Sequence, residues 1–97
     1  MSELDKIKLI LRRKKLLLQS KFKIKELGVF GSFVRGEQKK NSDVDILVEF
    51  SQTPGFFEFL KVENFLSGLL KKRVDLVMKD SLKPTIGRYI REEVIYV

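Results

Sequence analysis

Two aspartates separated by one residue, Asp43 and Asp45, are the strongest chemical signal in this sequence of 97 residues. They open the segment 43–50, whose β-branched and aromatic residues predict a strand. Alternate residues of a strand point to the same face, so both carboxylates would project together and repel each other. A divalent cation would offset that cost, because ions such as Mg²⁺ prefer carboxylate oxygens. An isolated Asp-x-Asp more often marks an exposed strand face or a turn, so the pair alone does not identify a site.

A third aspartate, Asp75, interrupts the otherwise apolar segment Val74-Asp75-Leu76-Val77-Met78, which also predicts a strand. If this strand lies beside the strand of Asp43 and Asp45, the third carboxylate joins the same site. The alternative is a surface-facing aspartate on an edge strand.

The segment Gly31-Ser32-Phe33-Val34-Arg35-Gly36 follows a predicted strand at 25–30. A glycine in this place lets the backbone approach a phosphate closely, and Ser32 would begin a short helix whose free amides bind anions. Arg35 adds a positive charge nearby. An ordinary strand-to-helix turn with a serine cap would have the same sequence.

The composition limits the chemistry that is available. The sequence has no cysteine and no histidine, which excludes disulfide frameworks, zinc fingers, Cys or His nucleophiles and imidazole bases. The 20 Lys and Arg against 13 Asp and Glu give a net charge of +7, which fits either a lysine-rich solvated surface or attraction to a polyanion such as a nucleotide or RNA. No apolar run is long enough to span a bilayer and no signal peptide is recognisable, so a cytoplasmic protein is expected.

The remaining elements predict an α/β (α+β) fold in a single domain, 1–97. Apolar residues at helical spacing predict an N-terminal helix over 1–20, in which Ser2 and Asp5 would cap the first turn. A second helix is expected at 56–72, and Pro84 suits the start of a last helix that turns Ile86 and Ile90 inward. The order predicts a small mixed sheet backed by helices, in which residues 43–79 form a crossover. The domain would consist of an N-terminal helix (1–20), a catalytic core (25–79) and a C-terminal helix (84–95).

The motifs together resemble the nucleotidyltransferase superfamily that includes DNA polymerase beta, and most closely its minimal nucleotidyltransferase branch. The resemblance rests on Gly31-Ser32-x-x-Arg35-Gly36, Ser42-Asp43-x-Asp45 after five residues, and Asp75 in a later strand. It runs from about residue 26 to residue 79 and more weakly to the end of the chain. One departure is Val34, where the family often has alanine.

The resemblance implies a polymerase beta-like fold and a metal-dependent transfer of a nucleotide. Asp43 and Asp45 would hold two Mg²⁺ ions, with Mn²⁺ as a substitute, and Asp75 would bind one of them and accept the proton of the attacking hydroxyl. The β- and γ-phosphates of ATP would lie at Gly31 and Ser32, while Arg35 would neutralise charge there and Ser42 completes the nucleotide-binding set. Lys39 and Lys40 could assist, although a solvated loop is the simpler interpretation.

The minimal branch is typically encoded beside a HEPN-domain RNase toxin, and acts as its antitoxin by transferring AMP to a toxin tyrosine. The resemblance therefore implies a protein adenylyltransferase whose acceptor is supplied by such a partner, with no membrane and no stable nucleic-acid complex. Three alternatives stay open: a non-catalytic antitoxin that only binds the toxin, transfer to RNA or a small molecule, and a basic nucleic-acid-binding module. The last predicts strong, salt-dependent nucleic-acid affinity without ATP. The phenylalanines of the 56–72 helix fit a protein interface only weakly, since such a helix more often packs into the core.

Overall fold

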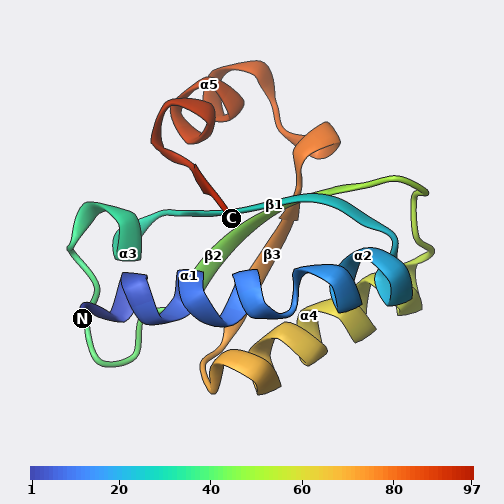
Figure 1. Cartoon of the computed structure of the whole chain (residues 1–97). Coiled ribbons are helices and arrows are strands. Elements are labelled where there is room, and N and C mark those ends of the chain that lie inside the picture. Colours follow the sequence, from blue (N-terminus) through green and yellow to red (C-terminus); the bar gives the residue numbers. More distant parts are fainter.

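The computed structural model describes all residues, 1–97, and places a four-stranded sheet between two unequal layers of helix (Figure 1). The strands lie in the order β3-β2-β1-β4. The central pair β1 and β2 is antiparallel, β2 and β3 are parallel, and β4 is antiparallel to β1. The predicted mixed sheet is therefore confirmed. The strands are β1 (Ile24–Phe30), β2 (Val44–Phe50), β3 (Val74–Met78) and β4 (Ile95–Tyr96).

Three helices cover one face of the sheet: α1 (Glu3–Arg13), α2 (Lys15–Phe22) and α4 (Phe56–Leu70) (Figure 1). Helix α4 connects β2 to β3, as expected for a crossover between parallel strands. The apolar faces of these helices and of the strands form one buried core. Its members include Ile7, Leu11, Leu18, Val29, Val44, Ile46, Val48, Val62, Leu66, Val74 and Leu76.

The other face of the sheet carries a single helix, α5 (Pro84–Glu93), which follows a short 3₁₀ turn, η1 (Lys79–Ser81) (Figure 1). Strand residues that alternate with the core positions point to this side, among them Asp45, Leu47 and Asp75. One helix covers this face only in part. A fifth short helix, α3 (Ser32–Arg35), lies at the end of β1.

The structure corrects the expected single helix over residues 1–20, which is broken at Lys14. The φ of −98° and ψ of 5° at this residue depart from helical geometry, and its amide contacts the carbonyls of both Ile10 and Leu11. No glycine or proline marks the break, so the pattern gave no sign of it. The cap at the start is confirmed, because Ser2 and Asp5 form a reciprocal capping box.

The C-terminal segment differs from the expectation at two points. Residues 95–96 form a strand, β4, which pairs with Gly28 and Val29 of β1. Ile86, expected to turn inward, is 56% exposed, whereas Ile90 is partly buried. Part of the apolar face of α5 is therefore uncovered, since Tyr89 is exposed as well.

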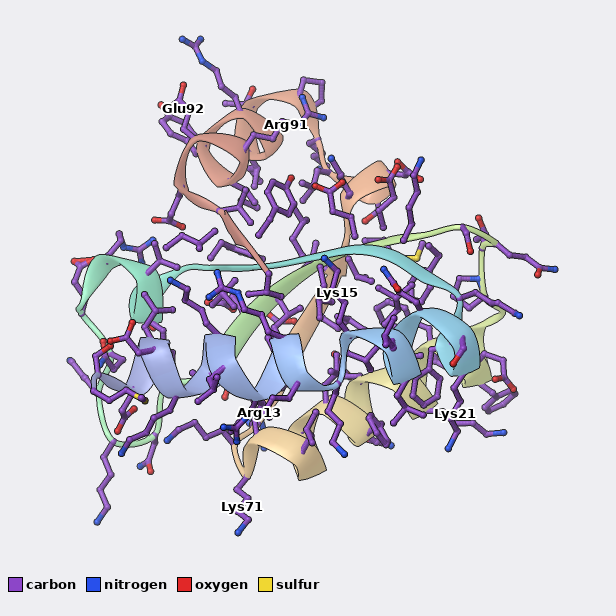
Figure 2. All side chains as sticks on the ribbon, in the orientation of Figure 1. Arg13, Lys15, Lys21, Lys71, Arg91 and Glu92 are labelled. Atoms are coloured by element: carbon purple, nitrogen blue, oxygen red, sulfur yellow. The ribbon has the colours of Figure 1, made fainter.

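The positive charge lies mainly on the outer helices. Arg13, Lys15, Lys21 and Lys71 are exposed on α1, α2 and the end of α4, and Lys21 and Lys71 point away from the sheet (Figure 2). Most of the excess of lysine and arginine is thus on the side of the sheet opposite Asp45. None of the helices combines the length and the apolar composition of a membrane-spanning segment.

Candidate active site

The sheet brings Asp45 and Asp75 together. The parallel register pairs Asp45 of β2 with Asp75 of β3, and the antiparallel register pairs Asp45 with Phe30, the last residue of β1. Directly paired residues point to the same face. Asp43 precedes β2 by one residue and is partly buried at the same end of the sheet. The predicted neighbourhood of the two aspartate strands is therefore confirmed.

Electrostatic crowding is concentrated on Asp45. Burial, followed by the negative charges of Asp75 and Asp43, raises the pKa of Asp45 from 3.8 to about 6, while the charge of Arg35 opposes this. A carboxyl hydrogen bond to Asp75 adds to the upward shift. The ionised form of Asp45 is thus held at a cost in the folded chain. A perturbed carboxylate with named charged neighbours in a cleft is a candidate for function.

The donor set fits a hard divalent cation in its chemistry. Carboxylate oxygens on neighbouring strands supply the ligand type and the negative charge that Mg²⁺ prefers. The side chains do not converge into a ready coordination sphere, because no group of three acidic residues is arranged to hold a metal ion. Asp45 with Asp75 is the pair brought closest by the register, and Asp43 acts on it through charge.

Gly31 joins the phosphate motif to the carboxylates. Its φ of 81° and ψ of −152° lie in a region that side-chain-bearing residues rarely adopt, and it directly precedes α3. A Cβ atom at this position would clash with Oδ2 of Asp45. The absence of a side chain at Gly31 is therefore what allows Asp45 to reach the end of β1. The short helix predicted to begin at Ser32 is confirmed.

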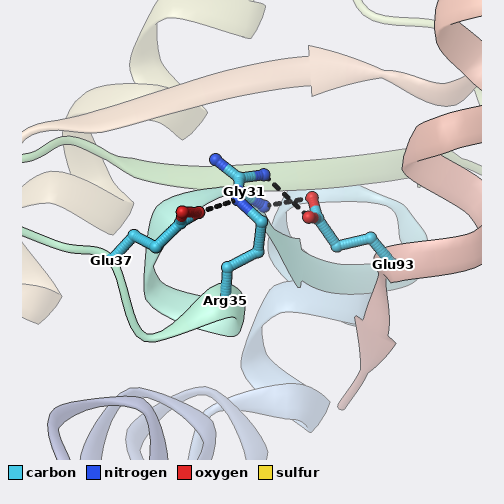
Figure 3. Close-up of polar contacts among 4 residues, drawn as sticks. All are labelled: Gly31, Arg35, Glu37 and Glu93. Carbon is cyan, nitrogen blue, oxygen red and sulfur yellow. Dashed lines mark hydrogen bonds and ion pairs between the residues drawn. The ribbon is translucent and has the colours of Figure 1, made fainter.

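A carboxylate from α5 binds the same motif (Figure 3). The Gly31 amide donates a hydrogen bond of 2.7 Å to Oε2 of Glu93, and Nη1 of Arg35 lies 2.7 Å from Oε1 of the same residue. Nε of Arg35 also donates to Glu37 at 2.5 Å. These bonds, with that to Glu93 contributing most, raise the pKa of Arg35. Gly31 and Arg35 together thus hold an anion, which is the property that the motif predicted, but the anion is an internal one.

The loop between α3 and β2 carries the remaining predicted residues. Ser42 accepts a hydrogen bond of 2.7 Å at its Oγ from the Lys39 amide, so it shapes the turn before Asp43. Lys39 and Lys40 are exposed, as expected of a solvated loop. Neither lysine side chain forms an ion pair, and their proposed role beside Arg35 stays a prediction.

Two cavities adjoin the carboxylates. The first, of about 460 Å³, has Gly31, Arg35 and Asp45 on one side and α5 on the other. The second, of about 340 Å³, lies between α4 and the start of β3 and is lined by both Asp43 and Asp75. The carboxylates therefore lie between the two cavities. Only the first cavity contains the anion-binding residues Gly31 and Arg35.

Glu93 and the wall formed by α5 were not found from the sequence. Ile86, Tyr89, Ile90 and Glu93 all line the first cavity, and their spacing places them on one face of the helix. That spacing was readable in advance, but it equally describes a face that packs on a core. Only the placement of α5 over the Asp45 side of the sheet shows that this face lines a cavity and does not pack on a core.

Comparison with known proteins agrees with this geometry. A family model described as a nucleotidyltransferase domain matches residues 5–97. The protein adenylyltransferase MntA of Thermococcus cleftensis is 50% identical over 97 residues, which cover 100% of this chain and 98% of that protein. A solved structure described as a candidate minimal nucleotidyltransferase has a TM-score of 0.74 at 30% identity and covers 98% of this chain and 95% of that one. A toxin–antitoxin crystal structure with AMP-PNP has a TM-score of 0.72 at 26% identity, covering 87% and 69% respectively.

Proposed function

This chain belongs to the nucleotidyltransferase domain family, and on that basis we propose that Asp43, Asp45 and Asp75 carry a metal-dependent transfer of AMP from ATP to a tyrosine of a partner protein. The chain is an MntA-like protein adenylyltransferase, because its similarity to that enzyme extends over its whole length. The assignment of roles to individual residues is our proposal.

The observation that carries this proposal is the register between β2 and β3. It places Asp45 directly beside Asp75, and Gly31 closes the same end of the sheet against Asp45. The resulting crowding of negative charge is costly for the folded chain, as the raised pKa of Asp45 indicates. Binding of cations, and of the phosphates that accompany them, would require this crowding of carboxylates although it is unfavourable for folding.

In the proposed reaction, the phenolic oxygen of the acceptor forms a bond to the α-phosphorus of ATP, and the bond from that phosphorus to the bridging oxygen breaks. Pyrophosphate leaves and the phenolic proton passes to Asp75. Asp43 and Asp45, with Asp75, would hold Mg²⁺ ions, which supply charge neutralisation and Lewis acidity when bound. The chain itself contributes the positions of Asp45 and Asp75 on two paired strands and of Asp43 just before the first of them.

The β- and γ-phosphates would lie against Gly31, Ser32 and Arg35, of which Gly31 and Arg35 line the first cavity. Glu93 now holds Gly31 and Arg35, so nucleotide phosphates have to compete with its carboxylate for these donors. Arg35 is 51% exposed, which leaves it free to exchange one anion for another.

The acceptor would enter through the second cavity, where Asp43 and Asp75 face Asn64 and Arg73. We expect the acceptor to belong to a HEPN-type RNase toxin, with this chain as its antitoxin. Support comes from the sequence resemblance and from the fold shared with the antitoxin-containing complex that holds AMP-PNP. In this view the partner presents its tyrosine on the side of the carboxylates away from the anion-binding motif.

Intact-mass spectrometry tests the proposal directly. The chain is mixed with a co-expressed HEPN-type partner, ATP and Mg²⁺, and the partner is expected to gain mass in steps of one AMP, with none after chelation of the metal. Asp75→Asn is expected to reduce the rate at least about a hundredfold, the scale of losing one group that acts on transition-state charge. Asp80→Asn, a change at an exposed aspartate just beyond β3, is the matched control and is expected to leave transfer unchanged.

Undiminished transfer by Asp75→Asn would contradict the residue assignment. Neutralisation of the toxin without any gain in mass would support the alternative of an antitoxin that acts only by binding.

A further inference from the structure

Helix α5 presents an exposed apolar face beside the carboxylates. Tyr89 is 70% exposed and Ile86 is 56% exposed, although both lie on a helix that the sequence predicted to pack inward. Both line the first cavity together with Ile90. The charged residues Arg88 and Glu92 of the same helix pair with each other instead. The apolar face of α5 therefore forms one side of the first cavity.

Along this face, an apolar and aromatic end is followed by an end that contacts the anion-binding residues. A nucleotide has the same order, with an aromatic base at one end and phosphates at the other. Ile86, Tyr89, Ile90 and Glu93 follow the spacing i, i+3, i+4, i+7, and Glu93 is the residue that contacts Gly31 and Arg35. Tyr89 lies about 6 Å along the helix axis from Glu93, given a rise of 1.5 Å per residue. The face thus runs from an apolar and aromatic end to an anion-binding end within one cavity of about 460 Å³.

We propose that this face is the nucleobase subsite, in which the ring of Tyr89 stacks on the base of the bound nucleotide while Ile86 and Ile90 cover its edge. The inference rests on the proposed function, since it assumes that the phosphates lie at Gly31 and Arg35. Aromatic rings stack on any base, because every base has a π-face. The subsite therefore contributes affinity for the nucleoside more than a choice among bases.

Equilibrium binding separates the base from the phosphates. AMP-PNP and inorganic tripolyphosphate, each with Mg²⁺, are titrated into the chain by calorimetry. Tyr89→Ala is expected to weaken AMP-PNP binding about five- to tenfold and to change tripolyphosphate binding by less than twofold, whereas Tyr89→Phe keeps both affinities. Phe57→Ala is the matched control, because Phe57 is a 76% exposed aromatic residue outside the cavity.

Tyrosine fluorescence gives a second readout that does not depend on affinity. The chain has two tyrosines and no tryptophan. AMP-PNP is expected to quench the emission of Tyr89, so quenching should persist in Tyr96→Phe and disappear in Tyr89→Phe, while tripolyphosphate should quench neither.

An equal loss of both ligands in Tyr89→Ala would overturn the subsite and give α5 a purely structural role. Unchanged binding of both ligands with slower AMP transfer to the partner would also overturn it, and would assign the face to the acceptor protein. If the unaltered chain bound tripolyphosphate but gained nothing from the nucleoside, only the subsite would fail. If it bound neither ligand, the proposed function would fail first.

Discussion

The two faces of the sheet are built from the same strands but have opposite properties. On the side of α1, α2 and α4, Val44, Ile46 and Val48 of β2 are at most 1% exposed in a continuous apolar core. On the side of α5, Asp45 lies between two of these residues in the sequence and is crowded by like charge. The alternation of β2 thus places Asp45 on the opposite face from Val44 and Ile46, although Leu47, two residues further along the Asp45 face, is buried again.

This contrast explains how so short a chain can hold an unfavourable cluster of carboxylates. The burial of apolar residues, mostly on one face, supplies the free energy of folding, while the paired backbones of β2 and β3 fix Asp45 and Asp75. Removing a group from either face should therefore change different quantities.

The largest effect on stability is expected on the core face. Ile46→Ala is expected to lower the free energy of unfolding by about 3 kcal/mol, because it removes fully buried apolar atoms and leaves a cavity. Ile86→Ala, at an exposed isoleucine on the other side of the sheet, is expected to change it by less than about 0.5 kcal/mol. Urea denaturation of both variants makes the comparison. Similar losses would show that α5 packs as tightly as the core helices.

A somewhat smaller loss of stability is expected from a change at Gly31 of the phosphate motif. Gly31→Ala is expected to cost about 2 kcal/mol, because φ is positive at this residue and the added Cβ would meet the Asp45 carboxylate. Nucleotide transfer should fall as well, since Asp45 has to move. Gly55→Ala is the control, because its φ of −72° suits alanine and nothing lies within 4 Å of the added atom. Equal stability of the two variants, measured by thermal melting, would contradict this coupling.

The core face was largely predictable from the sequence and the α5 face only in part. The composition of residues 43–50 and 74–78 identifies the two strands, and their period of two separates the aspartates from Val44, Ile46 and Val74, although Leu47 is buried as well. The spacing of Gly31, Ser32 and Arg35 marks the motif in the same local way. Neither the bond from Glu93 to Gly31 nor the exposure of Ile86 could be predicted, since both depend on where α5 lies over the sheet. Contacts between residues 62 positions apart leave no local pattern.

On the α5 side of the sheet, removing the negative charge of Asp45 is expected to stabilise the folded chain. The folded-state pKa of Asp45 is raised to about 6, so the folded chain binds its proton more tightly than the unfolded chain does. This contribution to stability is present at low pH and is lost as the pH rises from about 4 to about 6. At pH 7 in the presence of a chelator, Asp45→Asn is therefore expected to raise the free energy of unfolding by about 1 to 2 kcal/mol. This is less than the roughly 1.4 kcal/mol per pKa unit that linkage allows, because Asp45 is only partly buried and solvent screens its charge.

Denaturation curves recorded between pH 4 and pH 7 test this expectation. The difference between Asp45→Asn and the unaltered chain should be near zero at the lower pH and should grow as the pH rises. Asp80→Asn, at an exposed position, should show no such trend. Added Mg²⁺ should stabilise the unaltered chain and not Asp45→Asn, because a ligand stabilises only the form that binds it. A variant that is less stable at pH 7 would show that Asp45 is favourably placed in the folded chain.

The smallest expected effect is on nucleotide binding and concerns Glu93, which joins α5 to the phosphate motif through Gly31 and Arg35. If its carboxylate competes with nucleotide phosphates, Glu93→Gln should bind AMP-PNP about threefold more tightly, a modest gain because solvent screens the ion pair between Glu93 and the exposed Arg35. Glutamine can still accept the hydrogen bond from Gly31, so the fold should be kept. Glu92→Gln, at an exposed neighbour paired only with Arg88, should bind AMP-PNP unchanged in the same calorimetric titration. Weaker binding by Glu93→Gln would reverse the interpretation: Glu93 would then orient Arg35 toward the nucleotide, and the α5 face would support the site instead of competing for it.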